Sequence, residues 1–279
     1  SRFKKPIGYM LLFWPCAWGL TIAYDFSDEK ITYFYQLTLF LLGAILMRSA
    51  GCIVNDIADR RFDKKVYRTK NRPIASGRVS LVSGIIYSLI LCLIALIVLL
   101  QFNLLTIILA LLSMPLAFTY PLMKRYTYWP QLFLGITFNY GLILGWTSIK
   151  GEIDIIPILF YTGAIFWTLG YDTIYGYQDI NDDEIIGLKS TSIKFKGKAK
   201  KFIIACYTSL IVFFLIGAYS MKLNYNFYLF IIVPFIQLFL YQIKIVNLKD
   251  PSSCLKAFKS NNFLGLLIFL NILINKIYL

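Results

Sequence analysis

The amino-acid sequence predicts an all-α membrane protein, a polytopic bundle of about nine transmembrane helices around a central cavity. Hydrophobic residues make up 58% of the 279-residue chain, charged residues only 15%, and the mean hydropathy is +0.67. An average soluble domain carries about 25% charged residues. The composition therefore excludes an ordinary water-soluble enzyme.

Nine windows of about 20 apolar residues follow one another along the chain, and each is long enough to cross a hydrocarbon core of about 30 Å. The first follows the basic flank 2–5, the second and sixth each end in an acidic cluster, and the fifth follows the aromatic segment 126–129. Tight joins at 101–103 and 223–224 divide the remaining spans, so the count depends on these two joins. The predicted helices cover 7–24, 34–54, 80–101, 104–122, 130–149, 155–177, 202–221, 225–243 and 261–277.

The distribution of basic residues supports this count. With a cytoplasmic N-terminus, 23 of the 28 Lys and Arg residues fall on the cytoplasmic side, and only Arg48 lies inside a span. This asymmetry follows the positive-inside rule. The net charge of +14 is then explained by topology and by attraction to anionic lipid headgroups, so we expect a lipid bilayer and no nucleic acid as partner. Since the chain begins at Ser1 rather than Met, we also expect a trimmed N-terminus.

The cysteine and histidine content limits the possible chemistry. The five cysteines form no C-x-x-C pair, so neither a disulfide framework nor a zinc site is indicated. Histidine is absent, which excludes histidine-based acid/base chemistry and haem ligation by histidine. Any metal must be held by oxygen atoms, and the oxygens of Asp and Asn favour Mg²⁺ or Ca²⁺.

The first acidic cluster, residues 55–63, ends the second predicted helix. On a helix, Arg48, Asn55 and Asp59 lie within about 40° of arc, and Asp63 lies about 40° further round. Asn55, Asp59 and Asp63 are each one turn apart, so their oxygens can share a cation. The alternative is a solvated helix end, but Arg48 lies deeper on the same face, where an unpaired charge would be costly.

A basic loop follows the first cluster. Residues 64–77 carry five basic side chains directly after three aspartates. Carboxylates that hold cations beside Lys and Arg groups suit a metal–diphosphate complex. The rival explanation for any single lysine here is topology signalling.

The second acidic cluster, residues 172–183, ends the sixth predicted helix. Asp172, Asp179 and Asp183 also fall within about 40° on a helical wheel. The two clusters are four helices apart on the same predicted side, which suggests one domain, 1–279, with a possible repeat of four-helix units at 1–125 and 126–245 plus a last helix. The two acidic helix ends can then face each other across a central cavity.

Two spaced motifs carry a family resemblance, N-D-x-x-D-x-x-x-D from Asn55 to Asp63 and D-x-x-x-D from Asp179 to Asp183. They resemble the paired signatures of the UbiA superfamily of intramembrane prenyltransferases. Further matches resemble its 4-hydroxybenzoate polyprenyltransferase branch and run from one end of the chain to the other: 2–8, 14–15, 48–52, 71–73, 120–125, 171–173, 187–191 and 256–262. One departure is Asn181, where relatives often carry Asp.

This resemblance implies Mg²⁺-dependent transfer of a polyprenyl group from polyprenyl diphosphate to the ring carbon ortho to the hydroxyl of 4-hydroxybenzoate, an early step of ubiquinone synthesis. It also implies a bacterial or mitochondrial inner-membrane location, with the catalytic loops cytoplasmic. Metal ligands are expected at Asn55, Asp59, Asp63, Asp179 and Asp183. A catalytic role is expected for Asp56, Asp59, Asp63, Asp172, Asp179 and Asp183, and substrate binding for Arg48, Arg72, Lys124, Arg125 and Lys189.

Two alternatives stay open. The same chemistry can act on another acceptor, such as a naphthoate, homogentisate, a chlorophyll precursor, haem or a lipid alcohol. A cation-coupled transporter would also explain intramembrane acids, but not the basic loop beside each cluster. Prenyl chain length and oligomeric state do not follow from the sequence.

Overall fold

The computed structural model describes residue 3 and residues 6–64 and 69–277. The basic residues Arg2, Lys4 and Lys5 of the N-terminal flank and Lys65 and Arg68 of the basic loop lie outside the described residues. Within the described part of the chain all regular secondary structure is helical, as predicted. The elements are α1 (Ile7–Ala23), α2 (Lys30–Ala58), α3 (Arg60–Asp63), α4 (Leu81–Leu99), α5 (Leu104–Thr119), η1 (Tyr120–Leu122), α6 (Met123–Tyr126), α7 (Pro130–Asn139), α8 (Gly141–Lys150), α9 (Ile155–Gly176), α10 (Ile180–Ile185), α11 (Thr191–Lys194), α12 (Ala199–Ser220), α13 (Tyr225–Phe230), α14 (Ile232–Phe235), the π-helix η2 (Ile236–Ile245) and α15 (Pro251–Ile277).

The predicted spans correspond to nine apolar helical segments of the described chain. Eight are long and apolar enough to cross a membrane, and three of these join shorter elements: α5 to α6, α7 to α8, and α13 to η2. The ninth, α1, has 17 residues, which corresponds to about 26 Å at 1.5 Å per residue. A slightly thinned bilayer accommodates that length. The protein is therefore an integral membrane protein, and the predicted helical bundle is confirmed.

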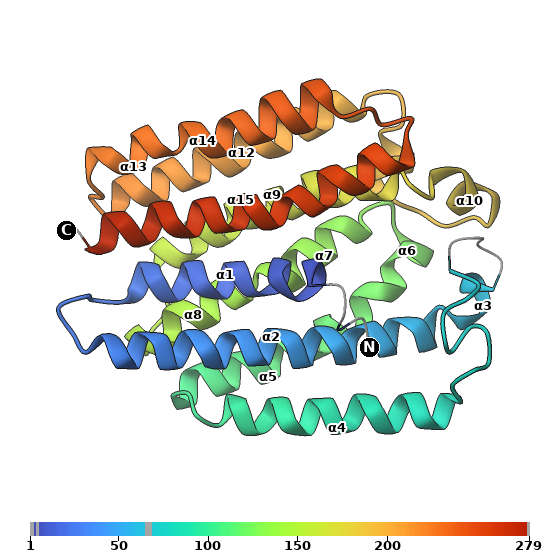
Figure 1. The fold of residues 1–279 in the computed structure, drawn as a ribbon, viewed down its shortest axis with the longest axis horizontal. Coiled ribbons are helices and arrows are strands. Elements are labelled where there is room, and N and C mark those ends of the chain that lie inside the picture. Colours follow the sequence, from blue (N-terminus) through green and yellow to red (C-terminus); the bar gives the residue numbers. More distant parts are fainter. Residues whose placement is uncertain (1–2, 4–5, 65–68, 278–279) are drawn as a thin grey trace.

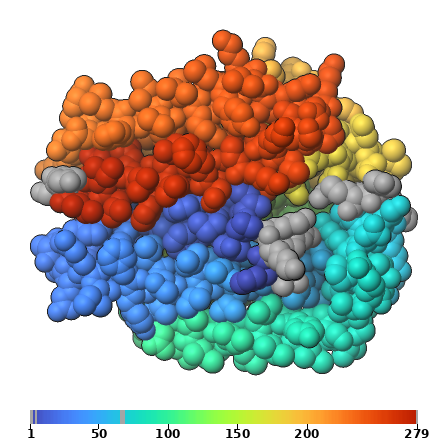
Figure 2. Space-filling model, in the orientation of Figure 1, coloured from blue at the N-terminus to red at the C-terminus, as the bar shows by residue number. Residues whose placement is uncertain are grey.

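Helix α1 lies in the middle of the bundle, between α2 and α15 (Figure 1), and it also packs against α8. The backbones of α1 and α8 come very close, because a Cβ added to Gly19 would overlap the Leu142 carbonyl and one added to Gly145 would overlap the Cys16 carbonyl. Small residues at such contacts allow close helix packing where no water drives association. The surface view shows α15 lying directly against α1 along the seam between the two halves of the chain (Figure 2).

Aromatic rings fill the core between α1, α9 and α12. Trp18 is fully buried, its ring centroid is 5.1 Å from that of Trp167, and its indole N–H donates to the Gly265 carbonyl at 3.0 Å. Trp167 in turn donates to Asn261 Oδ1 at 2.8 Å. These hydrogen bonds pair polar groups for which lipid tails offer no hydrogen-bond partner. They fix α15 against α1 and α9, and the end of α9 carries the start of the second acidic cluster.

Candidate active site

Both acidic clusters line the same cavity, which has a volume of about 1580 Å³. The short helices that carry the last residues of each cluster, α3 and α10, lie at the same end of the bundle (Figure 1). Segments that are more than 100 residues apart in the sequence therefore meet at one site. The cavity lining includes Asn55, Asp56, Asp59, Asp63, Asp172, Asp179, Asp183, Arg48, Arg72, Lys124 and Lys189.

The first cluster keeps the helical spacing that the sequence predicts. The Asp59 amide donates to the Asn55 carbonyl at 2.8 Å, and the Asp63 amide donates to the Asp59 carbonyl at 2.8 Å. The chain thus completes one helical turn between each pair, although Asp59 itself separates α2 from α3. As a result, Asn55, Asp59 and Asp63 present their side chains to the cavity from one stripe.

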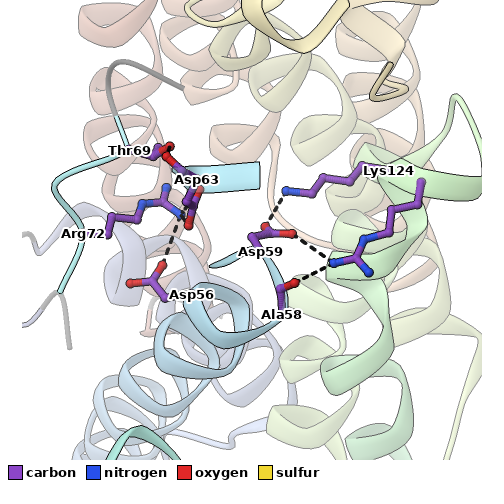
Figure 3. A network of polar contacts seen from close by, with 8 residues as sticks. Asp56, Ala58, Asp59, Asp63, Thr69, Arg72 and Lys124 are labelled. Atoms are coloured by element: carbon purple, nitrogen blue, oxygen red, sulfur yellow. Dashed lines mark hydrogen bonds and ion pairs between the residues drawn. The ribbon is translucent and has the colours of Figure 1, made fainter. Parts of the chain in front are cut away.

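Arg72 neutralises the outer acids of the first cluster. Its Nη1 atom lies 2.9 Å from Asp63 Oδ2 and 3.1 Å from Asp56 Oδ1. The Thr69 hydroxyl donates to the Asp63 carbonyl at 3.1 Å and fixes the start of the loop that carries Arg72. Burial raises the pKa of the Asp63 carboxyl, and the charge of Arg72 opposes that rise. Figure 3 shows the guanidinium between the two carboxylates.

Asp59 is the most buried acid of the first cluster, with 1% of its surface exposed. Lys124 forms an ion pair with its Oδ2 atom (Figure 3). Arg125 Nη2 lies 3.5 Å from Oδ1. That distance is too long for a hydrogen bond, and Oδ1 is a buried acceptor without a hydrogen-bond partner among the described residues. The site therefore holds a buried carboxylate oxygen with unused acceptor capacity.

Arg125, for which the sequence analysis expects a substrate-binding role, contacts the end of α2 and α3 instead of facing the cavity. Its Nη2 atom donates to the Ala58 carbonyl at 2.7 Å, and its guanidinium lies 5.1 Å from the Phe62 ring centroid. It is not among the residues that line the cavity. Arg125 thus caps the carbonyl end of α2 and holds the backbone that carries Asp59.

The second cluster is not one continuous helix. Helix α9 ends at Gly176, residues 177–179 form a turn, and α10 starts at Ile180. The helical wheel that placed Asp172 with Asp179 and Asp183 is therefore wrong in its detail, although the three side chains still line one cavity. Asp179 and Asp183 remain one turn apart, since the Asp183 amide donates to the Asp179 carbonyl at 2.9 Å.

Two hydrogen bonds join the segment after the second cluster to helix α6. The Lys189 amide, just after α10, donates to the Lys124 carbonyl at 2.8 Å, and Lys189 Nζ donates to the Tyr126 carbonyl at 3.2 Å. The Lys189 ammonium also lies 5.6 Å from the Tyr128 ring centroid. Since the Lys124 side chain also reaches Asp59, helix α6 is bonded both to the first cluster and to the segment that follows the second.

A second group of side chains lies deeper in the cavity, around Arg48. Its guanidinium lies 5.1 Å from the Phe138 ring centroid and interacts electrostatically with Tyr120 and Asp172. Arg48 Nε is a buried donor without a hydrogen-bond partner among the described residues. An added Cβ on Gly8 would lie 2.8 Å from that atom, so α1 approaches Arg48 closely. The cavity thus offers a cationic donor at its inner end.

Tyr120 and Thr69 are site residues to which the sequence analysis gave no role, although Tyr120 begins the resembling segment 120–125. Tyr120 lines the cavity from η1, and its neighbour Pro121 marks the break between α5 and α6. The Tyr-Pro pair at the end of an apolar run was the available signal. Thr69 follows the first cluster by six residues, and nothing in its spacing distinguishes it from other loop threonines.

The donor set fits a magnesium ion, although the described residues contain no group of three acids close enough to hold a metal by themselves. The expected ligands Asn55, Asp59, Asp63, Asp179 and Asp183 offer carboxylate and amide oxygens, which are the ligands Mg²⁺ prefers. The buried Oδ1 of Asp59 provides one acceptor in place. Since Mg²⁺ is commonly held by a few carboxylates together with substrate phosphates, a site that is completed by a ligand agrees with this arrangement.

Fold and site define a polytopic membrane protein with one cavity that is lined by both acidic and basic side chains. The UbiA prenyltransferase family matches residues 12–272, and the chain belongs to this family. 4-Hydroxybenzoate geranyltransferase 1 of Lithospermum erythrorhizon is 41% identical over 283 residues, which cover 100% of this chain and 89% of the relative. The mitochondrial 4-hydroxybenzoate polyprenyltransferase of Rattus norvegicus is 42% identical over 282 residues, which cover 99% of this chain and 74% of the relative.

A solved structure has the same fold. The UbiA homolog from Archaeoglobus fulgidus bound to GPP and Mg²⁺ superimposes with a TM-score of 0.72 at 15% identity, and the match covers 100% of both chains. At this identity the likeness establishes the architecture of the bundle and nothing finer.

Proposed function

We propose that this protein transfers a prenyl group from a prenyl diphosphate to the ring carbon ortho to the hydroxyl of 4-hydroxybenzoate. The observation that carries the proposal is the meeting of two acidic clusters and their basic loops around one cavity of about 1580 Å³. Full-length identity of about 40% to 4-hydroxybenzoate prenyltransferases supports the choice of acceptor. In this reaction the allylic C–O bond breaks, diphosphate leaves, a ring C–C bond forms and the ring loses a proton.

The acidic clusters would hold Mg²⁺ through Asn55, Asp59, Asp63, Asp179 and Asp183. When bound, the ion would neutralise charge that develops on the departing diphosphate. Arg72, Lys124 and Lys189 line the same cavity and supply further positive charge for the diphosphate oxygens. Asp56 would act indirectly by orienting Arg72, with which it shares an ion pair.

Arg48 would bind the carboxylate of the aromatic acid. It offers an unused buried donor, and the planar guanidinium matches a carboxylate. Asp172 lies close enough to interact with Arg48 and would orient it or accept the ring proton. The aromatic lining, including Tyr120, Phe138 and Tyr175, offers π-faces to an allylic cation. The surrounding bilayer keeps water from that cation.

Membranes that contain the chain, supplied with geranyl diphosphate, radiolabelled 4-hydroxybenzoate and Mg²⁺, should form a labelled, lipid-extractable prenylated acid. A panel of acceptors containing a naphthoate, homogentisate and a lipid alcohol tests the alternative substrates in the same assay. Transfer to one of these in preference to 4-hydroxybenzoate would contradict the proposed acceptor but would still support prenyl transfer as the reaction. Absence of transfer to every acceptor, with an active relative as positive control, would contradict the proposed function.

A further inference from the structure

We infer that Lys124 is an exchangeable counter-ion: it neutralises Asp59 in the metal-free site and moves to the diphosphate when a divalent cation takes its place at Asp59. The inference rests on the proposed function only in taking a diphosphate as the ligand. In this inference Lys124 contacts the diphosphate and also couples the binding of the metal to the binding of the diphosphate.

Burial makes neutralisation of Asp59 obligatory. A carboxylate with 1% of its surface exposed loses nearly all of its hydration and needs a compensating charge. The Lys124 ammonium, paired with Oδ2, supplies that charge together with the Arg125 guanidinium, which lies 3.5 Å from Oδ1. A divalent cation bound to the same carboxylate would stand beside the ammonium, and the two positive charges would repel each other. Metal and Lys124 therefore compete for Asp59.

Compared with Arg72 and Arg125, Lys124 is better suited to leave. Arg72 is held by two carboxylates, and Arg125 is fixed by the Ala58 carbonyl and the Phe62 ring. Lys124 carries a compact ammonium on a flexible four-carbon stem, and its side chain is 27% exposed toward the cavity.

The backbone of Lys124 keeps the released ammonium near the second cluster. The Lys124 carbonyl accepts the hydrogen bond from the Lys189 amide at 2.8 Å, and both lysines line the cavity together with Asp179 and Asp183. A diphosphate bound between the clusters lies within reach of this tethered side chain. The Lys124 ammonium that the metal displaces from Asp59 then pairs with the diphosphate. Metal and diphosphate therefore each favour binding of the other.

The first experiment measures binding of Mn²⁺, as a spectroscopic substitute for Mg²⁺, to the full chain in lipid nanodiscs with and without inorganic pyrophosphate. Lys124→Gln should bind Mn²⁺ about fivefold to tenfold more tightly without pyrophosphate, and pyrophosphate should improve Mn²⁺ affinity by a smaller factor than in the original protein. Lys189→Gln removes the same charge from the same cavity, but its ammonium contacts the Tyr126 carbonyl rather than a carboxylate. Lys189→Gln therefore measures how much Mn²⁺ affinity changes when one positive charge is lost from the cavity without loss of a carboxylate partner.

The inference is wrong if Lys124→Gln and Lys189→Gln change Mn²⁺ affinity equally, or if the pyrophosphate effect is unchanged in Lys124→Gln. A second measurement needs no variant and stays informative if Lys124→Gln fails to fold. Amine acylation of Lys124, quantified by peptide mass spectrometry against Lys189, should rise with Mn²⁺ alone and fall again when pyrophosphate is added. An extent of Lys124 acylation that does not change when Mn²⁺ is added would also overturn the inference. Neither measurement involves prenyl transfer, so their failure is separate from failure of the proposed function.

Discussion

Arg72 Nη1 lies 2.9 Å from Asp63 Oδ2, and the same nitrogen lies 3.1 Å from Asp56 Oδ1. One guanidinium thus fixes the relative positions of two acids that lie seven residues apart. Such a pair also keeps positive charge at the edge of the cavity, where a diphosphate would bind. Arg72 therefore supports the first cluster and also lines the cavity in which the proposed diphosphate would bind.

Replacing Arg72 by Gln should lower kcat/KM for the prenyl diphosphate by about 100-fold or more, because removal of one preorganised donor typically costs that much. Arg72→Lys should recover only part of the loss, since an ammonium cannot reproduce the guanidinium geometry. The measurement is steady-state kinetics in nanodiscs. Arg61→Gln, at an exposed neighbour on α3, is the matched control, and an equal loss there would remove Arg72 from the site.

Asp59→Asn and Asp183→Asn should each lower turnover by orders of magnitude while the protein still inserts into the membrane. Both carboxylates line the cavity, and the amide keeps the size of the side chain while it removes the negative charge that holds a cation. Turnover and the yield of membrane-extracted protein are measured together. Glu184→Gln alters an exposed acid that is paired with Lys196 at 2.7 Å and should retain near-normal rates. Near-normal rates in the two aspartate variants would exclude them from catalysis.

Removal of divalent cations should abolish transfer reversibly. Chelation with EDTA followed by a return of Mg²⁺ should restore the rate, because the oxygen-only donor set favours a hard cation. Ca²⁺ should restore less activity, since it takes more ligands at longer distances. Full activity in the chelator would contradict the metal requirement.

Much of the fold follows from the sequence, because hydrophobic length and charge asymmetry are local signals that a bilayer turns into helices. The stripe from Asn55 to Asp63 was also predictable, since one helical period relates its members. The break at 177–179 was not predictable, because the seven-residue spacing of Asp172 and Asp179 is also that of one continuous helix and gives no sign of a turn between them. The position of Arg125 against Ala58 and Phe62 depends on how α6 meets α2 in space, which no local pattern encodes.

The close approach of α1 and α8 predicts that Gly145 tolerates no side chain. Gly145→Val would drive its Cβ into the backbone of Cys16 and Leu20, and overpacking of this kind typically costs about 1–3 kcal/mol. We expect a lower thermal unfolding midpoint in detergent for this variant. Gly43→Ala is the matched control, because no atom lies within 4 Å of its added Cβ. A midpoint for Gly145→Val equal to that of Gly43→Ala would show that the two helices can separate without loss.

Arg48 should decide which aromatic acceptor the cavity takes. If its guanidinium binds the acceptor carboxylate, the protein should use 4-hydroxybenzoate in strong preference to 4-hydroxybenzamide, because a site built for a charged partner leaves Arg48 unpaired when that partner is neutral. Arg48→Gln should raise the KM for 4-hydroxybenzoate, reduce the preference between the two acceptors and leave the KM for the prenyl diphosphate nearly unchanged. The ratio of kcat/KM values for the two acceptors measures this preference. Lys189→Gln, which alters the mouth of the cavity near the second cluster, should keep the preference. A preference that survives in Arg48→Gln would show that another group reads the carboxylate.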